Sequence, residues 1–173
     1  MTRSANQRAH RKRRQAAAAA AAAVLPAEHH HDLEQKLGHT FADPTILQEA
    51  LQAAGNGVRQ IGDRTIEDGN KRLALLGDSI MTLVLLRGWY KDGESRKSGH
   101  DALVAISSNK NLNERGQESG LSVFINKNKS FPNGVVPPRT MSDTVEALIG
   151  AVFVDSSESL EAVKVAMTGL GLV

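Results

Sequence analysis

The sequence predicts an all-α fold, and three observations lead to that prediction. Apolar residues recur at helical spacing in several segments, and no segment alternates apolar and polar residues as a half-buried strand does. Asp43 followed by Pro44 is a typical helix start, with an N-cap residue before a first-turn proline. The stretch 73–86 is apolar with few interruptions, which is typical of a central helix buried on most sides.

The N-terminal half should contain three helices. A short helix over 32–37 should end at Gly38, because glycine readily adopts the conformation that closes a helix. A second helix should run over 44–54, and residues 55–68 should form a loop because they are rich in glycine and other turn-forming residues. The third helix, which contains the apolar stretch, should run over about 68–90.

The C-terminal half should contain three more helices. One is expected over 99–118, and a loop containing Lys127 and Lys129 follows it. The next helix should be capped by Thr140 or Ser142, whose hydroxyls can accept from free backbone N–H groups, and should end near Val154. An amphipathic helix over 158–170 closes the chain.

Length and composition limit the classes of protein that fit. The chain has 173 residues, which suggests one domain, and only 3% of them are aromatic, so the core must be mainly aliphatic. It has no cysteine, which excludes disulfides and thiolate metal sites. No run of about 18 apolar residues occurs, so we expect no membrane span and no membrane partner.

Residues 1–27 are predicted to be a basic, alanine-rich tail, and residues 28–173 the folded domain. The basic cluster Arg11, Lys12, Arg13 and Arg14 is typical of nuclear-import or nucleic-acid-binding segments. An arginine-rich start without acids also suits a mitochondrial transit peptide, and a solvated arm with no targeting role is a further alternative. We therefore expect an intracellular protein and leave nucleus and mitochondrion open.

Three acids are candidates for metal chemistry. Asp143 and Glu146 are three residues apart, which places both on one side of a helix, and Asp78 follows Gly77, which would let another backbone come close. Three carboxylates from two helices could hold a divalent cation such as Mg²⁺, with Mn²⁺ as the other possibility. The alternative is that these acids are solvated or paired with nearby lysines and arginines.

Two separated stretches resemble the hallmark segments of the ribonuclease III family. Residues 70–78 read Asn-Lys-Arg-Leu-Ala-Leu-Leu-Gly-Asp, and residues 143–151 read Asp-Thr-Val-Glu-Ala-Leu-Ile-Gly-Ala. The resemblance implies the helical ribonuclease III endonuclease-domain fold and a catalytic metal held by carboxylates. Asp78, Asp143 and Glu146 match the family's catalytic and metal-binding positions. Position 74, where the family has a fourth carboxylate, is Ala74, and position 71, usually Glu, is Lys71.

The resemblance implies metal-dependent hydrolysis of double-stranded RNA, and the departures at Lys71 and Ala74 keep an alternative open. In that alternative the chain is a catalytically impaired RNA-binding or assembly protein, for example one associated with ribosomes. A helical scaffold whose acids are surface charges is a weaker third possibility. In detail the chain is similar to short fungal members of the family that lack a C-terminal double-stranded-RNA-binding domain.

The resemblance also implies a homodimer and a set of RNA contacts. The family dimerises through the helix of the first motif, where Leu75 takes the place of an aromatic residue, so the interface should be smaller. Candidate RNA-binding residues are Lys71, Asn109, Lys127, Lys129 and the basic cluster Arg11, Lys12, Arg13 and Arg14. For Asn109, support of the active-site helix and simple solvent exposure are open alternatives.

Overall fold

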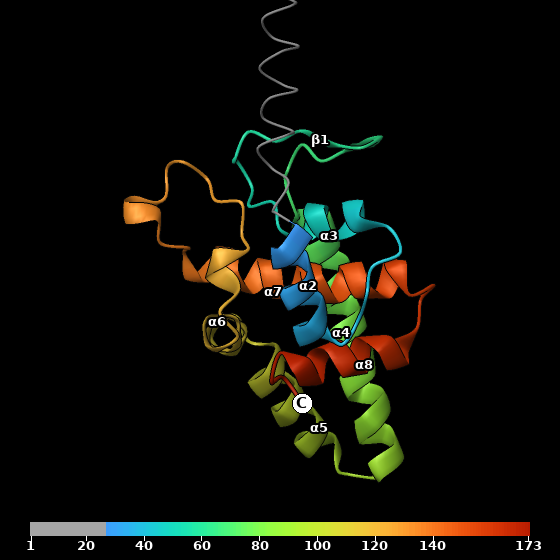
Figure 1. Cartoon of the computed structure of the whole chain (residues 1–173). Coiled ribbons are helices and arrows are strands. Elements are labelled where there is room, and N and C mark those ends of the chain that lie inside the picture. Colours follow the sequence, from blue (N-terminus) through green and yellow to red (C-terminus); the bar gives the residue numbers. More distant parts are fainter. Residues whose placement is uncertain (1–26) are drawn as a thin grey trace, which may run out of the picture.

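The computed structural model describes residues 27–173, which form a bundle of helices with one small hairpin (Figure 1). The elements are α2 (Ala27–Leu37), α3 (Pro44–Ala50), β1 (Gln60–Ile61), β2 (Arg64–Thr65), α4 (Lys71–Asp92), α5 (Arg96–Ser107), α6 (Asn109–Glu118), η1 (Leu121–Val123), η2 (Pro132–Gly134), α7 (Pro138–Asp155) and α8 (Leu160–Gly169). The predicted all-α class is confirmed. Apart from Ala27, the predicted basic tail lies outside the described residues.

The centre of the domain is α7, which runs through the middle of the bundle in Figure 1. Every residue from Met141 to Val152 is buried, and the helix packs against α3, α4, α6 and α8. The most extensive of these contacts is with α4, where Gly77 and Gly150 face each other's backbone. A side chain at either position would overlap the opposite helix, so these glycines allow the close crossing that the sequence predicted for Gly77.

The prediction that α4 is buried on most sides was wrong. Its buried residues all lie in the N-terminal half, on the side that faces α7. The opposite side carries exposed apolar residues: Leu75 (73% exposed), Leu83 (47%), Leu86 (36%) and Tyr90 (79%). We call these four residues the α4 stripe. By length and composition alone α4 could cross a membrane, but one such helix is weak evidence when half of it packs into the core of the domain.

Other helix boundaries also differ from the prediction. The helix expected over 99–118 is two helices, because Ser108 is extended (ψ 140°) and its hydroxyl caps the start of α6 at Asn111 N–H. α3 ends at Ala50 rather than near 54. α7 begins one turn before the predicted caps, directly after Pro137, and no side chain caps it.

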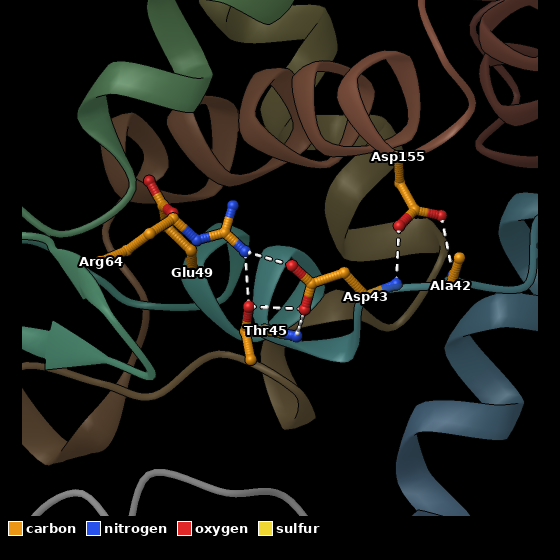
Figure 2. A network of polar contacts seen from close by, with 6 residues as sticks. All are labelled: Ala42, Asp43, Thr45, Glu49, Arg64 and Asp155. Atoms are coloured by element: carbon orange, nitrogen blue, oxygen red, sulfur yellow. Dashed lines mark hydrogen bonds and ion pairs between the residues drawn. The ribbon is translucent and has the colours of Figure 1, made fainter.

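A hairpin that the sequence did not predict connects α3 to α4. Its two strands have two residues each, which is too short for an alternating pattern to be visible in the sequence. Arg64 holds it to α3, donating to Asp43 Oδ2 at 2.9 Å and to the Thr45 hydroxyl, with Glu49 Oε2 3.6 Å from its Nε (Figure 2). Asp43 also caps α3 through the Thr45 N–H, as predicted.

Asp155, the last residue of α7, has a structural role. Its carboxylate accepts from the N–H groups of Ala42 and Asp43, both at 2.9 Å, and pairs with His39 Nε2 at 2.8 Å (Figure 2 shows the backbone contacts). Burial alone would raise the pKa of Asp155, but these hydrogen bonds together outweigh burial and lower it. Asp155 therefore ties the end of α7 to the start of α3.

Candidate functional site

Asn70 sets the position of the first motif. Its side chain is buried between three helices, and its amide donates to Ala50 O at 2.9 Å and to Thr144 Oγ1 at 3.2 Å. Its own N–H donates to Gln52 O at 2.9 Å. These bonds fix the start of α4 against the end of α3 and the side of α7, so that Lys71, the next residue, lies beside the acids of α7.

The two cations nearest the acids both bind Asp143. Lys71 Nζ pairs with Asp143 Oδ2, and Arg139 Nε lies 3.2 Å from Asp143 Oδ1. The Asp143 side chain is 5% exposed, whereas those of Lys71 and Arg139 are 40% and 65% exposed. Each oxygen of this buried carboxylate therefore already has a cation of the same chain as its partner.

Glu146 lies one turn further along α7 and is buried at 8% exposure. Burial, followed by the negative charges of Asp78 and Asp143, raises the pKa of Glu146 from 4.5 to about 7. Arg139 and Lys71 act in the opposite direction. We call Asp78, Asp143 and Glu146 the acid cluster, because the charges of Asp78 and Asp143 are close enough to act on Glu146.

We predict that Glu146→Gln stabilises the domain at alkaline pH. Between the ordinary pKa of 4.5 and about 7, native Glu146 holds a proton that the unfolded chain has released, so stability falls as pH rises through this window. The substitution should therefore add about 1–3 kcal/mol at pH 8 and much less at pH 5. Urea unfolding of both proteins at the two pH values checks this, and an equal effect at both would contradict it.

The described residues do not fit the metal that the family resemblance implies. Within residues 27–173 no group of three or more histidine, cysteine, aspartate or glutamate side chains is placed to hold a metal ion. Ala74, at the position of the fourth carboxylate, is 3% exposed and belongs to the hydrophobic core. Asp143 is paired with two cations, which leaves Asp78 and Glu146 as the free carboxylates of the acid cluster.

The remaining predicted residues lie apart from these contacts. Asn109 is exposed at the first position of α6, Lys127 is half-buried and Lys129 is exposed in the loop between η1 and η2. Within the described part of the chain, none of the three has a hydrogen bond or ion pair to the acid cluster. The sequence reasoning missed Arg139, although its spacing of four residues before Asp143 on a helix was a usable signal.

A hollow of about 390 Å³ lies elsewhere, between the C-terminal half of α4, α5 and α8. It is lined by apolar side chains that include Leu85, Trp89 and Leu103, and by charged residues of α4 and α8. None of the predicted site residues lines it. The candidate functional site is therefore the region of charged contacts between α4 and α7, and not this hollow.

Comparison with known proteins places this arrangement in a family. Residues 71–157 match the ribonuclease III domain. The chain is 30% identical over 132 residues to Ribonuclease 3 of Fusobacterium nucleatum, covering 73% of this chain and 55% of that protein. It is 29% identical over 129 residues to Ribonuclease 3 of Bdellovibrio bacteriovorus, covering 71% and 53%.

The fold is also similar to a solved structure of the nuclease domain of ribonuclease III from Campylobacter jejuni. That structure has a TM-score of 0.63 and 26% identity, and the match covers 81% of this chain and 92% of that one. The chain spans about half the length of the curated relatives that it matches. The matched residues contain the second motif, all of the first motif except Asn70, and the whole acid cluster, and the chain therefore belongs to the ribonuclease III domain family.

Proposed function

We propose that the chain acts on double-stranded RNA as an endoribonuclease of the ribonuclease III type, with low hydrolytic activity. The observation that carries the proposal is the acid cluster, in which Asp78, Asp143 and Glu146 come together where α4 crosses α7. The resemblance of the two motifs assigns these three residues to the family's catalytic positions. The low activity follows from Ala74, which supplies no ligand, and from the cations that pair with Asp143.

A second candidate function is duplex RNA binding or assembly without cleavage. The ion pair between Lys71 and Asp143 favours it, because an ammonium group beside a carboxylate repels a divalent cation. Both candidates share the fold and the substrate class. They differ in whether a phosphodiester bond is hydrolysed, so one assay distinguishes them.

We also propose that the α4 stripe is the surface of a homodimer. Four exposed apolar side chains on one side of one helix form the kind of surface that a partner normally covers. One Campylobacter jejuni nuclease-domain structure, 24% identical to this chain with a TM-score of 0.66, is described as having a flexible region involved in dimer formation. We propose that a second copy of the chain, and not a membrane, covers the α4 stripe.

RNA contacts outside the acid cluster are proposed for Asn109, Lys127 and Lys129, and for the basic cluster at Arg11–Arg14. Phosphate contacts of this kind read no sequence and weaken with salt. Double-stranded RNA of any sequence should therefore bind equally well at a given salt concentration.

A cleavage assay on long duplex RNA tests the proposal. We expect slow cleavage with Mg²⁺ or Mn²⁺, no cleavage of single-stranded RNA, and loss of the activity in Glu146→Gln, which keeps the shape of the side chain and removes its charge. Products would be separated by size after incubation with excess protein. Bound but intact duplex in every condition would reject the enzyme and support the second candidate.

A further inference from the structure

Lys71 and Arg139 are the cations that the chain itself places against the acid cluster. Lys71 is the first residue of α4 and Arg139 the second of α7, so the two enter from different helices and reach opposite oxygens of Asp143. Neither of them pairs with another carboxylate within the described part of the chain. Both oxygens of Asp143 are therefore already paired with cations of this protein.

We propose that Lys71, together with Arg139, takes the place of a divalent metal at Asp143, so that this domain binds the phosphates of double-stranded RNA without any metal ion. The inference deepens the proposed action on double-stranded RNA, because it names what neutralises the acid cluster when the duplex is bound.

The exposure of the two cations supports a role toward a ligand. The buried carboxylate takes one donor from each, but an ammonium has three N–H donors and a guanidinium five. The side chains are 40% exposed for Lys71 and 65% for Arg139, so both can be reached by a ligand from solvent. Each can hold Asp143 and a phosphate oxygen at the same time, which is how a bridging cation acts.

Electrostatic interactions also favour Lys71 over a metal ion as the partner of Asp143. A cluster of bare carboxylates repels the RNA backbone, and a metal ion normally removes that repulsion by binding both the carboxylates and the phosphate. In this domain a metal would have to displace Lys71 from a carboxylate that is 5% exposed, at a position where Ala74 supplies no compensating oxygen. Lys71 should therefore bind Asp143 in preference to a metal ion, because it is part of the chain and a metal ion would have to bind from solution.

Two measurements on the full chain test the inference. The first is Mn²⁺ binding by the protein without RNA, followed through the electron paramagnetic resonance signal of free Mn²⁺. We expect only weak binding by the wild type, enough for the slow cleavage proposed above, and clearly tighter binding by Lys71→Met, in which Asp143 is partly released. Tight Mn²⁺ binding by the wild type would overturn the proposal whatever the RNA measurement shows.

The second measurement is duplex RNA binding by fluorescence anisotropy, in EDTA and in Mg²⁺. Wild-type affinity should change by less than about a factor of two between the two conditions, because no metal contributes to binding. Lys71→Met should bind about tenfold more weakly in EDTA, and Mg²⁺ should restore part of the loss. Wild-type binding that disappears in EDTA would overturn the proposal.

Two control variants keep the outcomes separate. Lys71→Arg keeps a cation and should keep metal-independent binding, which covers the case in which Lys71→Met fails to fold. Lys97→Met removes an exposed lysine that pairs with Asp101, 86% and 58% exposed, and should change neither measurement. If the wild type binds no duplex at all, the proposed function fails, while Mn²⁺ binding still decides whether Lys71 replaces a metal.

Discussion

Replacing Gly77 with alanine is expected to destabilise the domain by about 3 kcal/mol, the upper part of the usual range for overpacking a tight contact. A Cβ at this position would overlap the carbonyl oxygen of Glu146 and lie 2.8 Å from Gly150 N. All of these atoms are backbone, so no change of rotamer can make room. The two motif helices would have to move apart, and the acid cluster with them.

Gly88 provides a matched control on the same helix. A Cβ there would meet nothing within 4 Å, and the residue is exposed on the side of α4 away from the α4 stripe. Gly88→Ala should therefore stabilise the domain by about 0.5–1 kcal/mol through helix propensity alone. Urea denaturation of both variants gives the comparison, and equal stability of the two would mean that the helices do not cross as closely as the structure shows.

The Gly77 contact also explains why both motifs are needed for one site. The atom that a larger residue would strike belongs to Glu146, the residue whose ionisation is most perturbed in the acid cluster. The closeness of the crossing thus sets how near Asp78, the residue after Gly77, lies to the acids of α7. A stable Gly77 variant with altered spacing should lose the raised pKa of Glu146, because that pKa depends on burial and on these neighbours.

Local signals predicted the parts of the fold that local chemistry decides. Asp43 and Pro44 start α3 because a carboxylate cap and a first-turn proline act within one turn of chain. Gly77 was expected to allow a close backbone approach, and it does. The break at Ser108 was missed because serine tolerates both helical and cap positions, and its neighbours decide which one it adopts.

The rest depended on contacts between distant segments. α4 is apolar on two sides, and such a pattern normally predicts a helix that is buried all round. In the structure one apolar side of α4 lies in the core and the other, the α4 stripe, lies at the surface. The spacing of seven residues puts Lys71 and Asp78 on the same side of a helix, but the sequence could not show which residue Lys71 pairs with. Asn70 fixes the register between α4 and α7 that brings Lys71 to Asp143, and that register is a tertiary property.

Restoring the two missing acids is the sharpest test of the site. Ala74→Glu adds a carboxylate one helical turn before Asp78, and Lys71→Glu removes the cation that pairs with Asp143. We expect Ala74→Glu alone to strengthen Mg²⁺ binding modestly, because Lys71 still competes for Asp143. The double variant should gain about 1–3 kcal/mol per added charged contact, which is roughly 5- to 150-fold in affinity for each.

Calorimetric titration with Mg²⁺ measures the gain, and two controls separate its sources. Ala74→Glu combined with Lys71→Met removes the cation at position 71 without placing a carboxylate there. The difference in Mg²⁺ affinity from the double variant therefore isolates the effect of the carboxylate at position 71. Ala74→Gln tests whether a longer side chain is tolerated where Ala74 is 3% exposed, and thermal melts in EDTA show whether each variant folds. Folded variants that bind Mg²⁺ no better than the wild type would show that the acid cluster does not converge on one cation. Tighter binding accompanied by duplex cleavage that Glu146→Gln abolishes would show that the wild-type domain lacks only these two carboxylates of a full ribonuclease III site.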